Sequence, residues 1–509
     1  MQYILAHDLG TSGNKATLYA ADGTARGSVL VPYDTHFFNG CWAEQDPDDW
    51  WGAVCGSTRR LLEDAGVNAA DVAVVALSGQ MMGCTPVDAE GRALRPSMLY
   101  CDQRATAEAD AVLAQMPLDA FYRVVGHRVS ASYTLEKLMW LRAHEPEVFA
   151  KTDKTLCAKD YVNFRLTGRM ATDYSDASGT NAFDINTFRW SEDVLACAGI
   201  RPEMFPEALP STAILGGVTP AAASATGLLA GTPVAVGGGD GSAAGVGVGC
   251  VRPGSAYNCM GSSSWIALTV KEPVVDPEMR TMNWAHCVPG YLHPSGTMQT
   301  AGSCFKWLAE QLCAEEAAEA ARTGASRYAL IDAKAASSPV GANGVVFLPY
   351  MLGERTPWWN PDARGAFIGL NLASTRADMM RAVLEGVAMN LGYIVDIFRG
   401  GDVSFERGLR IIGGGAQSRV LRQILADACG CPVHTLASTA EATSMGAAVI
   451  GGVACGLFPG FDVVDELLKT ADTVEPVPAN VAFYRGRMDV MVKAYHGLKD
   501  VYAALASGR

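Results

Sequence analysis

The chain opens with Tyr3-Ile4-Leu5-Ala6-His7-Asp8-Leu9-Gly10-Thr11-Ser12-Gly13, an apolar strand that enters a turn of glycines and hydroxyl residues. An alternating run leaves the turn at 16–20, and a third β-rich run at 28–33 follows the hairpin signal Asp22-Gly23. The pattern predicts an antiparallel start whose first hairpin exposes consecutive backbone N–H groups. Such a loop is a concavity that binds phosphate oxygens without a lysine of the Walker type.

The same design returns in the second half of the chain. Two β-like runs, 255–260 and 265–270, are joined by Gly261-Ser262-Ser263-Ser264. We therefore expect two α/β domains, 1–250 and 251–509, whose hairpins hold phosphates from both sides of a cleft. Taken alone, the second hairpin is more simply interpreted as an ordinary turn. Whether the last helices pack back on the first domain stays open.

Composition and charge limit the classes of protein to which this chain can belong. The 509 residues are 49% hydrophobic and 18% charged, which is typical of a globular chain. The net charge of −13 is spread along the sequence, which argues against nucleic-acid and anionic-membrane partners. The first residues lack a basic segment, no apolar run reaches 18 residues, and the fourteen cysteines form no C-x-x-C pair. These features predict a cytoplasmic protein with reduced thiols.

Two further loops follow buried strands. The run 72–77 opens into Ser78-Gly79-Gln80-Met81-Met82-Gly83, and the run 232–236 opens into Gly237-Gly238-Gly239-Asp240. In open α/β sheets, loops at the ends of strands carry binding sites. Neither a Walker loop nor G-x-G-x-x-G occurs in the chain, so a P-loop enzyme and a simple dinucleotide dehydrogenase are disfavoured.

Two carboxylates fit phosphoryl transfer, which needs a metal near the phosphates and a group that accepts the proton of the attacking hydroxyl. Asp8 ends an apolar strand just before the first hairpin, where a carboxylate can hold hydrated Mg²⁺. Asp240 lies among glycines at the start of a small-residue helix, which favours an ionised base. The alternative for Asp240 is a helix N-cap.

A third glycine turn follows the strand 409–412. Gly413-Gly414-Gly415 leads to Ser418, which is predicted to cap the next helix. Bare backbone at such a turn admits a ribose or an adenine, although three glycines alone are weak evidence. Upstream, Thr375 and Asp378 predict a capping box before a long amphipathic helix.

The order of these elements resembles the FGGY family of carbohydrate kinases over essentially the whole chain. His7–Gly13 is similar to its first phosphate motif, Met260–Ser264 to its second, and Ile412–Ser418 to its adenosine motif. Phe347-Leu348-Pro349-Tyr350 with Gly353-Glu354-Arg355-Thr356-Pro357 resembles its C-terminal signature. The resemblance implies an α/β fold of two actin-like (ribonuclease H-like) domains with the active site in the cleft between them.

The resemblance also implies the residues of the site. Asp8 supports Mg²⁺, through water, and Asp240 takes the proton from a sugar hydroxyl. The acceptor sugar is bordered by Gln80, Met81, Met82, Asp102 and Asp240. ATP is bound by Gly10, Thr11, Ser12, Gly13, Gly261, Ser262, Ser263, Gly413, Gly414, Gly415 and Ser418.

Within the family, the segments 42–47, 78–81, 159–161 and 173–180 look most like xylulokinases. Three positions on the sugar side depart from the xylulokinase pattern. Met82 stands in place of a histidine, Gly241 in place of an asparagine, and Tyr100-Cys101-Asp102 in place of Trp-Asn-Asp.

The leading hypothesis is therefore ATP-dependent phosphorylation of D-xylulose. The departures keep open another ketose or a polyol as the acceptor, and a catalytically silent actin-like sugar sensor is a third alternative. The expected partners are a small sugar, ATP and Mg²⁺, and a homodimer stays open.

Overall fold

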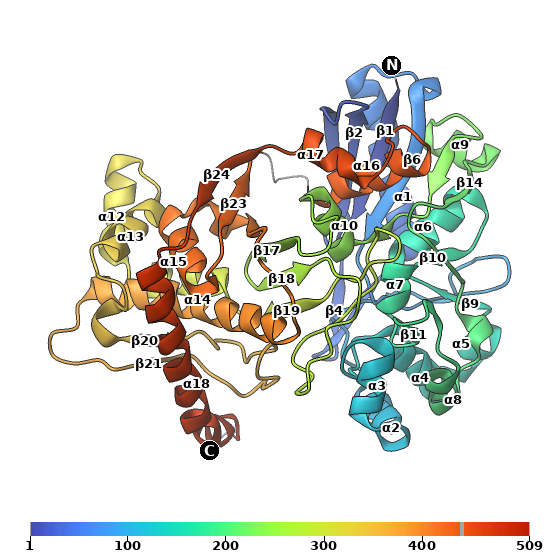
Figure 1. The fold of residues 1–509 in the computed structure, drawn as a ribbon. Helices are drawn as coiled ribbons and strands as arrows, with labels where there is room; N and C mark the ends of the chain where they lie inside the picture. Colours follow the sequence, from blue (N-terminus) through green and yellow to red (C-terminus); the bar gives the residue numbers. More distant parts are fainter. Residues whose placement is uncertain (1, 438–441, 508–509) are drawn as a thin grey trace.

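The computed structural model describes residues 2–437 and 442–507, arranged around two large mixed sheets (Figure 1). The strands of the first half are β1 (Tyr3–Leu9), β2 (Gly13–Ala20), β3 (Ala25–Pro32), β4 (His36–Phe38), β5 (Trp42–Gln45), β6 (Val72–Gly79), β7 (Thr85–Val87), β8 (Ser97–Met98), β9 (Lys154–Leu156), β10 (Ala171–Asp173), β11 (Phe183–Asp184), β12 (Arg189–Trp190), β13 (Glu207–Leu209), β14 (Ile214–Gly217), β15 (Pro233–Ala235) and β16 (Gly238–Gly239). Its helices are α1 (Pro47–Ala65), α2 (Thr106–Gln115), α3 (Leu118–Val125), α4 (Thr134–His144), α5 (Pro146–Lys151), α6 (Ala158–Thr167), α7 (Tyr174–Ser178), α8 (Glu192–Ala198), α9 (Pro220–Thr226) and α10 (Asp240–Gly247).

The second half repeats the mixture of strands and helices. Its strands are β17 (Ala256–Met260), β18 (Ser264–Leu268), β19 (Ser295–Met298), β20 (Val346–Leu348), β21 (Ala366–Ile368), β22 (Leu409–Ile412), β23 (Val433–Leu436) and β24 (Thr470–Val474). Its helices are α11 (Gly302–Gln311), α12 (Ala314–Thr323), α13 (Arg327–Ala336), α14 (Arg376–Gly400), α15 (Arg419–Cys429), α16 (Ala442–Ala454), α17 (Val464–Leu467) and α18 (Pro478–Ala506).

In each large sheet, the first two strands along the chain form the predicted hairpin. The first sheet has the order β14-β15-β6-β1-β2-β3, with β16 also paired to β6. The second has the order β19-β18-β17-β22-β23-β24. In both sheets the two strands of the glycine hairpin are antiparallel, and the first of them pairs in parallel with a later strand, β6 or β22. The repeated hairpin therefore holds an equivalent place in each sheet.

The helix ends follow the capping signals of the sequence. Asp46 accepts the N–H of Asp48 at the start of α1, and Gly66 ends that helix in the left-handed region with φ 62°. The capping box of Thr375 and Asp378 is present at the start of α14. Ser418 accepts the N–H of Leu421 at the start of α15. These three helix starts confirm the predictions.

Helix α16 connects the two halves of the chain. Its Ala447 and Ala448 belong to the apolar cluster formed by residues of β1 and β6, and in Figure 1 this red helix lies beside the blue strands. A Cβ at Gly446 would lie 1.8 Å from the carbonyl oxygen of Ala243, so glycine lets α16 approach α10 closely. The long helix α18 instead contributes Tyr484 and Met488 to the core of the second half.

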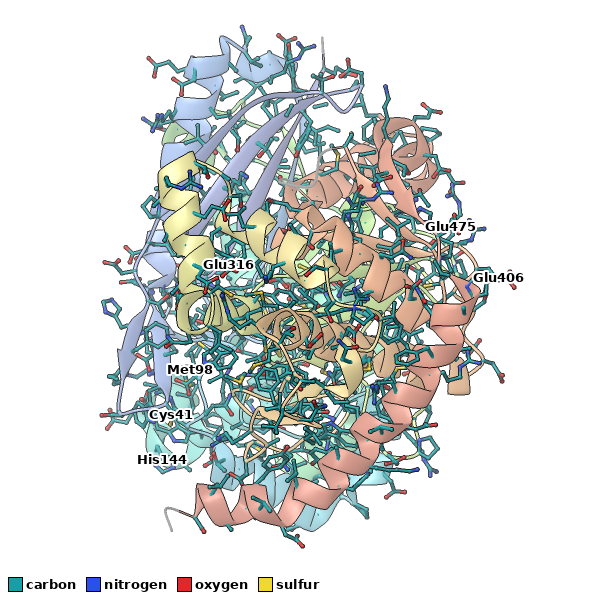
Figure 2. The ribbon with its side chains drawn as sticks, turned by 90° about the vertical axis from the view of Figure 1, so that its left-hand side faces the viewer. Cys41, Met98, His144, Glu316, Glu406 and Glu475 are labelled. Atoms are coloured by element: carbon teal, nitrogen blue, oxygen red, sulfur yellow. The ribbon has the colours of Figure 1, made fainter. Side chains whose placement is uncertain are left out.

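A separate apolar cluster lies below the first sheet. It joins α2, α3, α4 and α8 through buried side chains such as Val112, Phe121 and Leu138. Figure 2 shows this region from the side, with His144 at the end of α4, and Met98 and Cys41 lie above it. One of these helices, α4, contacts the strand-end loop 80–83, since the Thr134 hydroxyl at its start donates to the Gly83 carbonyl at 3.0 Å. Within residues 2–437 and 442–507, no helix has both the length and the apolar character needed to cross a bilayer.

Candidate active site

Asp8 and Asp240 lie on opposite sides of one strand. In the register of the first sheet, Ser78 of β6 is opposite Asp8 on one side and Gly238 on the other. The Ser78 hydroxyl donates to the Asp8 carboxylate at 3.2 Å. Asp240 follows β16 directly and begins α10. The fold thus brings together two carboxylates that are 232 positions apart in the sequence.

The environment of Asp240 suits a proton acceptor. Burial and, secondarily, the negative charge of Asp8 raise the pKa of Asp240 to about 7, against the lowering effect of the Gly241 N–H. That N–H donates to the Asp240 carboxylate at 2.7 Å. The N-cap of α10 is Gly239, so the alternative role of Asp240 as the helix cap does not describe this structure.

The first hairpin is tied to the interior by side chains of other strands. The Gly10 N–H donates to the Gly13 carbonyl at 3.1 Å, which closes the turn. Gln45, on β5, donates to the Thr11 carbonyl at 2.6 Å. Ser12 at the tip is exposed. A Cβ at Gly13 would lie 2.7 Å from the Val31 carbonyl oxygen, so only glycine fits between β2 and β3 there.

The second hairpin borders a pocket of about 570 Å³ in the second half. Five of the residues predicted to bind ATP line it: Gly261, Ser262, Gly414, Gly415 and Ser418. Gly413 does not line the pocket. It has a φ of 86°, and a Cβ there would lie only 2.4 Å from the Met260 carbonyl oxygen, so a larger residue does not fit. Ser263 is not among the lining residues of this pocket. The two glycine segments, about 150 residues apart in the chain, therefore share one pocket.

The pocket also has side chains that lie outside the quoted motifs. Phe305, Lys306, Tyr328 and Asp332 contribute to its wall. They come from α11 and α13. Tyr257, on the strand that leads into the second hairpin, donates its hydroxyl to the Gly241 carbonyl at 2.8 Å. The second hairpin is thus joined to the residue after Asp240.

Gln80 connects the loop after β6 to the first hairpin. Its N–H donates to the Leu9 carbonyl at 2.9 Å, and its side-chain amide donates to Gln45 Oε1 at 2.7 Å. Gln45 in turn holds Thr11, so one chain of hydrogen bonds runs from Gln80 to the hairpin. The Oε1 atom of Gln80 is buried and has no hydrogen-bond partner among the described residues. A buried acceptor of this kind is ready for a ligand hydroxyl.

Met81 and Met82 border the glycines of two neighbouring loops. A Cβ at Gly239 would lie 2.6 Å from Met81 Sδ, so Met81 packs directly over the residue before Asp240. Met82 has φ 62°, a left-handed conformation that is uncommon outside glycine. A Cβ at Gly241 would meet nothing within 4 Å. The position after Asp240 therefore has open space beside it.

Asp102 is fully buried and bound to protein groups. Its carboxylate forms an ion pair with Arg104 at 2.7 Å and accepts the N–H of Ala43 at 2.7 Å. Arg104 also pairs with Glu44 at 2.7 Å and lies over the ring of Trp42, 3.9 Å from its centroid. Asp102 thus anchors the 100–102 loop to β5.

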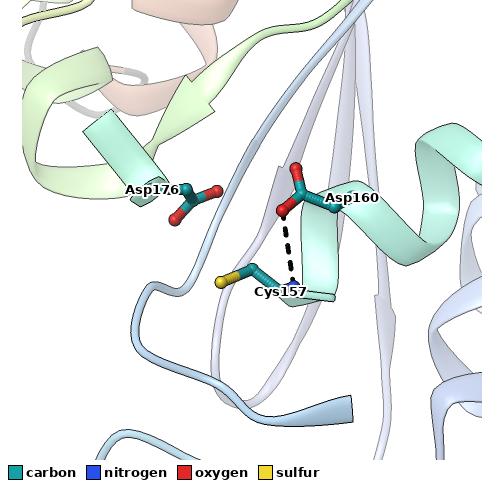
Figure 3. A group of neighbouring side chains, drawn as sticks. All are labelled: Cys157, Asp160 and Asp176. Carbon is teal, nitrogen blue, oxygen red and sulfur yellow. Dashed lines mark hydrogen bonds between the residues drawn. The ribbon is translucent and has the colours of Figure 1, made fainter. Parts of the chain in front are cut away.

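A buried group of Cys157, Asp160 and Asp176 has ligand atoms within 4.8 Å of one another (Figure 3). The ammonium of Lys159 lies among the carboxylates, 2.5 Å from Asp160, 3.2 Å from Asp176 and 3.3 Å from Asp173. Lys159 therefore supplies the positive charge that these carboxylates need, and the group is an internal ion cluster.

A different cation can be held at the strand ends. Asp8 and Asp240 offer the hard carboxylate oxygens that Mg²⁺ prefers, and the charge of Asp8 contributes to the raised pKa of Asp240. A divalent cation between the phosphates and these carboxylates would offset that like-charge repulsion. The residues present therefore fit Mg²⁺.

Comparisons with known proteins agree with this geometry. The chain is 32% identical to the xylulose kinase of Escherichia coli, over 97% of this chain and 99% of that protein. It is 28% identical to the gluconokinase of Bacillus licheniformis, over 99% of this chain and 98% of that protein. The crystal structure of xylulose kinase from Rhodospirillum rubrum has 31% identity and a TM-score of 0.89, and covers 99% of this chain and 100% of its own.

The family models cover most of the sequence. Residues 3–247 match the N-terminal domain of the FGGY family of carbohydrate kinases, and residues 256–455 match its C-terminal domain. The predicted fold class, α/β with actin-like (ribonuclease H-like) domains, is confirmed, as is the predicted sugar kinase activity. The chain belongs to the FGGY family of carbohydrate kinases.

Proposed function

We propose that this enzyme transfers the γ-phosphoryl group of ATP to a hydroxyl of D-xylulose. The observation that carries the proposal is the pair of strand-end carboxylates: Asp240, with a pKa of about 7, lies across β6 from Asp8. Relatives named xylulose kinase, about 30% identical over nearly the full length, support the choice of sugar. The gluconokinase relatives make a sugar acid the second acceptor to test.

In the proposed reaction Asp240 accepts the proton of the attacking hydroxyl as the sugar oxygen forms its bond to the γ-phosphorus. The bond between that phosphorus and the β,γ-bridging oxygen breaks, and ADP leaves with its electron pair. A base with a pKa near 7 is ionised in about half of the molecules at pH 7 and still accepts a proton readily. The buried Oε1 of Gln80 accepts a hydrogen bond from a second sugar hydroxyl and thereby orients the sugar.

The phosphates are proposed to lie between the two hairpins. Backbone N–H groups of Gly10–Gly13 and of Gly261–Ser263 bind phosphate oxygens, and the adenosine enters the pocket beside Gly414, Gly415 and Ser418. Asp8 would hold Mg²⁺, through water, and the ion would neutralise charge on the β- and γ-phosphates. Asp102 borders the sugar through the loop that it anchors.

We also propose that the chain divides near residue 250, so that the acceptor sugar is held by the first domain and the adenosine by the second. All of the proposed sugar contacts come from residues before 242, whereas the residues that line the adenosine pocket come from 260 onward.

The proposed location is the cytoplasm. The fourteen cysteines are free thiols, which supports a reducing environment.

The test is ADP release with a panel of acceptors at fixed ATP and Mg²⁺. The panel holds D-xylulose, other ketoses, polyols and gluconate, and ATP without acceptor is the blank. The highest kcat/KM with D-xylulose supports the proposal, and a higher value with gluconate or a polyol moves the assignment to that acceptor. A silent sugar sensor would bind a sugar in calorimetry without releasing ADP.

A further inference from the structure

Lys137 is a fully buried lysine in the middle of α4, the helix at 134–144. Its ammonium donates one hydrogen bond to each of three backbone carbonyls. These belong to Met82 at 2.9 Å, Leu99 at 2.6 Å and Ser132 at 2.6 Å. Three donors thus meet three acceptors, and the side chain has the partners that a buried ammonium needs.

The three carbonyls belong to three separate segments. Met82 lies in the loop after β6, Leu99 directly precedes the 100–102 loop, and Ser132 lies in the turn before α4. The first two segments are those that the proposed function places around the acceptor sugar. One ammonium therefore joins both of them to a helix that itself makes no proposed contact with the sugar.

Lys159 is also fully buried in the first half of the chain, and a comparison with it shows what is unusual about Lys137. Lys159 lies among three carboxylates, and their charges outweigh burial and raise its pKa well above the ordinary value. Lys137 has neutral carbonyl partners. Its ammonium is held by loop backbone, so the position of the ammonium and the position of the two loops depend on each other.

The backbone of Met82 needs such support. Its φ of 62° is costly for a side chain with a Cβ, and such conformations persist where surrounding contacts fix them. The hydrogen bond from Lys137 to the Met82 carbonyl is one such contact. Met82 Cγ also approaches the Cβ position of Gly179 to 3.6 Å, which places the side chain against the loop after α7.

We propose that Lys137 is a positioning residue for the acceptor sugar, whose charged ammonium holds the Met82 loop and the 100–102 loop in their binding arrangement. The proposal rests on the proposed location of the sugar at these loops. It predicts that loss of the ammonium raises the KM for sugar and leaves the KM for ATP unchanged. The adenosine pocket is built from residues 260 onward, and none of the three carbonyls that Lys137 holds belongs to the first phosphate hairpin.

The ionisation of Lys137 supplies a second readout. Burial lowers the pKa of Lys137 to about 8. The groups that face it are Asp102, Glu136 and the thiols of Cys84, Cys101 and Cys157. Burial raises the pKa of each of the three thiols, and it raises that of Glu136 to about 8. Above pH 8 the neutral amine has two hydrogens for three carbonyls, so one of the three segments loses its donor and the arrangement of the others is held less firmly.

The contribution of Lys137 to folding stability rises with pH, whereas sugar binding should weaken. A loss of sugar binding can therefore be distinguished from unfolding. The unfolded lysine keeps its proton up to about pH 10.5, whereas the folded one loses it near 8. Between these values the unfolded state binds more protons, so the contribution of Lys137 to stability rises with pH. A KM for sugar that increases in this window therefore does not follow from unfolding caused by Lys137.

The experiment measures KM for D-xylulose, or for the best acceptor of the panel, from pH 6.5 to 10 at saturating ATP. The variants are Lys137→Met, which removes all donors, and Lys137→Gln, which keeps two donors and does not titrate. Exposed Lys151→Met, at the end of α5, is the matched control. Thermal melting at each pH monitors folding. Glu136→Gln, next to Lys137, checks that a rise of KM near pH 8 does not come from the neighbouring carboxyl.

At pH 7 we expect Lys137→Met to raise the KM for sugar roughly tenfold or more, with kcat changed by less than about threefold and the KM for ATP unchanged. In the unmodified enzyme and in Glu136→Gln, the KM for sugar should rise above pH 8. In Lys137→Gln it should be moderately raised and independent of pH.

Two results overturn the proposal. One is a folded Lys137→Met whose KM for sugar at pH 7 equals that of the unmodified enzyme and of Lys151→Met. The other is a rise near pH 8 that persists in Lys137→Gln. If Lys137→Met does not fold, an unchanged KM for sugar in Lys137→Gln overturns the proposal instead. If no acceptor in the panel releases ADP, the proposed function fails instead, and the two failures are distinguishable.

Discussion

The carboxylates of Asp8 and Asp240 flank the same strand end, and the negative charge of Asp8 contributes, after burial, to raising the pKa of Asp240 to about 7. Two like charges in one site favour the protonated form of one of them. The arrangement therefore keeps a carboxylate base close to neutral pH and offers a site for a cation. Both properties are useful for phosphoryl transfer to a hydroxyl.

Asp240→Asn is expected to lower kcat by about 10²–10⁴-fold while ATP still binds, because the amide has nearly the same shape and cannot accept a proton. ADP release and nucleotide titration measure the two effects. Near-normal turnover would contradict the role of a base.

The same variant should be more stable than the unmodified protein at pH 8. The folded-state pKa of Asp240 lies above the ordinary value, so ionisation costs stability progressively from about pH 4 to 7, and the full cost remains above pH 7. Replacement by asparagine removes a cost of about 4 kcal/mol at pH 8 and almost none at pH 4. Thermal melting at the two pH values checks the difference, and Asp110→Asn, at an exposed position of α2, is the control.

Asp8→Ala is expected to weaken catalysis in a way that depends on Mg²⁺, since its carboxylate is assigned to the hydrated ion. Raising Mg²⁺ should recover part of the lost activity. The acid limb of kcat/KM should also move below pH 7, because the charge that helps to raise the pKa of Asp240 is gone. A folded variant with the same loss at every Mg²⁺ concentration would show that Asp8 does not support the metal.

The two halves are expected to close on ligands, because a hairpin from each must reach the same phosphates and because water in an open site would hydrolyse ATP. Small-angle scattering with D-xylulose and a non-hydrolysable ATP analogue should give a smaller radius of gyration than the free protein. An unchanged radius at saturating ligand would argue against closure. The sugar alone is the control that separates its effect from that of the nucleotide.

Local signals were sufficient for the hairpins and the helix caps. Glycine turns, capping residues and alternating strands act over a few residues, so Asp46, Thr375 and Ser418 begin their helices where the sequence predicts. The neighbouring positions of Asp8 and Asp240 depend on how β16 pairs with β6. No spacing along the chain gives that pairing directly.

Gln45 and Lys137 were not identified from the sequence for a related reason. A polar residue at the end of a short strand, or a lysine in a helix, normally faces solvent. Both are fully buried here because loops distant in the chain supply their hydrogen-bond partners. A weak signal existed for Lys137, since Leu138 and Trp140 place apolar side chains on nearly opposite faces of α4.

The acceptor site is where this chain departs from its xylulokinase-like pattern, and it carries the last prediction. Met82 offers a sugar only a weak acceptor, and Gly241 offers no side chain, so D-xylulose should be held by fewer hydrogen bonds than a histidine and an asparagine would provide. We expect weak apparent affinity for D-xylulose. Met82→His, alone or with Gly241→Asn, should shift kcat/KM toward D-xylulose by about fivefold for each restored bond, or about 1 kcal/mol.

The structure indicates that both substitutions can be accommodated. Histidine is one of the residues that adopts the left-handed region more readily than most, so it suits the φ of 62° at position 82. A side chain at position 241 begins in open space, since a Cβ there meets nothing within 4 Å. Melting temperatures of the variants should therefore stay near that of the unmodified protein, and a change in kcat/KM reports on the sugar. If the unmodified enzyme already strongly prefers D-xylulose and Met82→His loses activity while remaining folded, Met82 is an accommodated alternative within a xylulose site, and the changed-acceptor hypothesis is wrong.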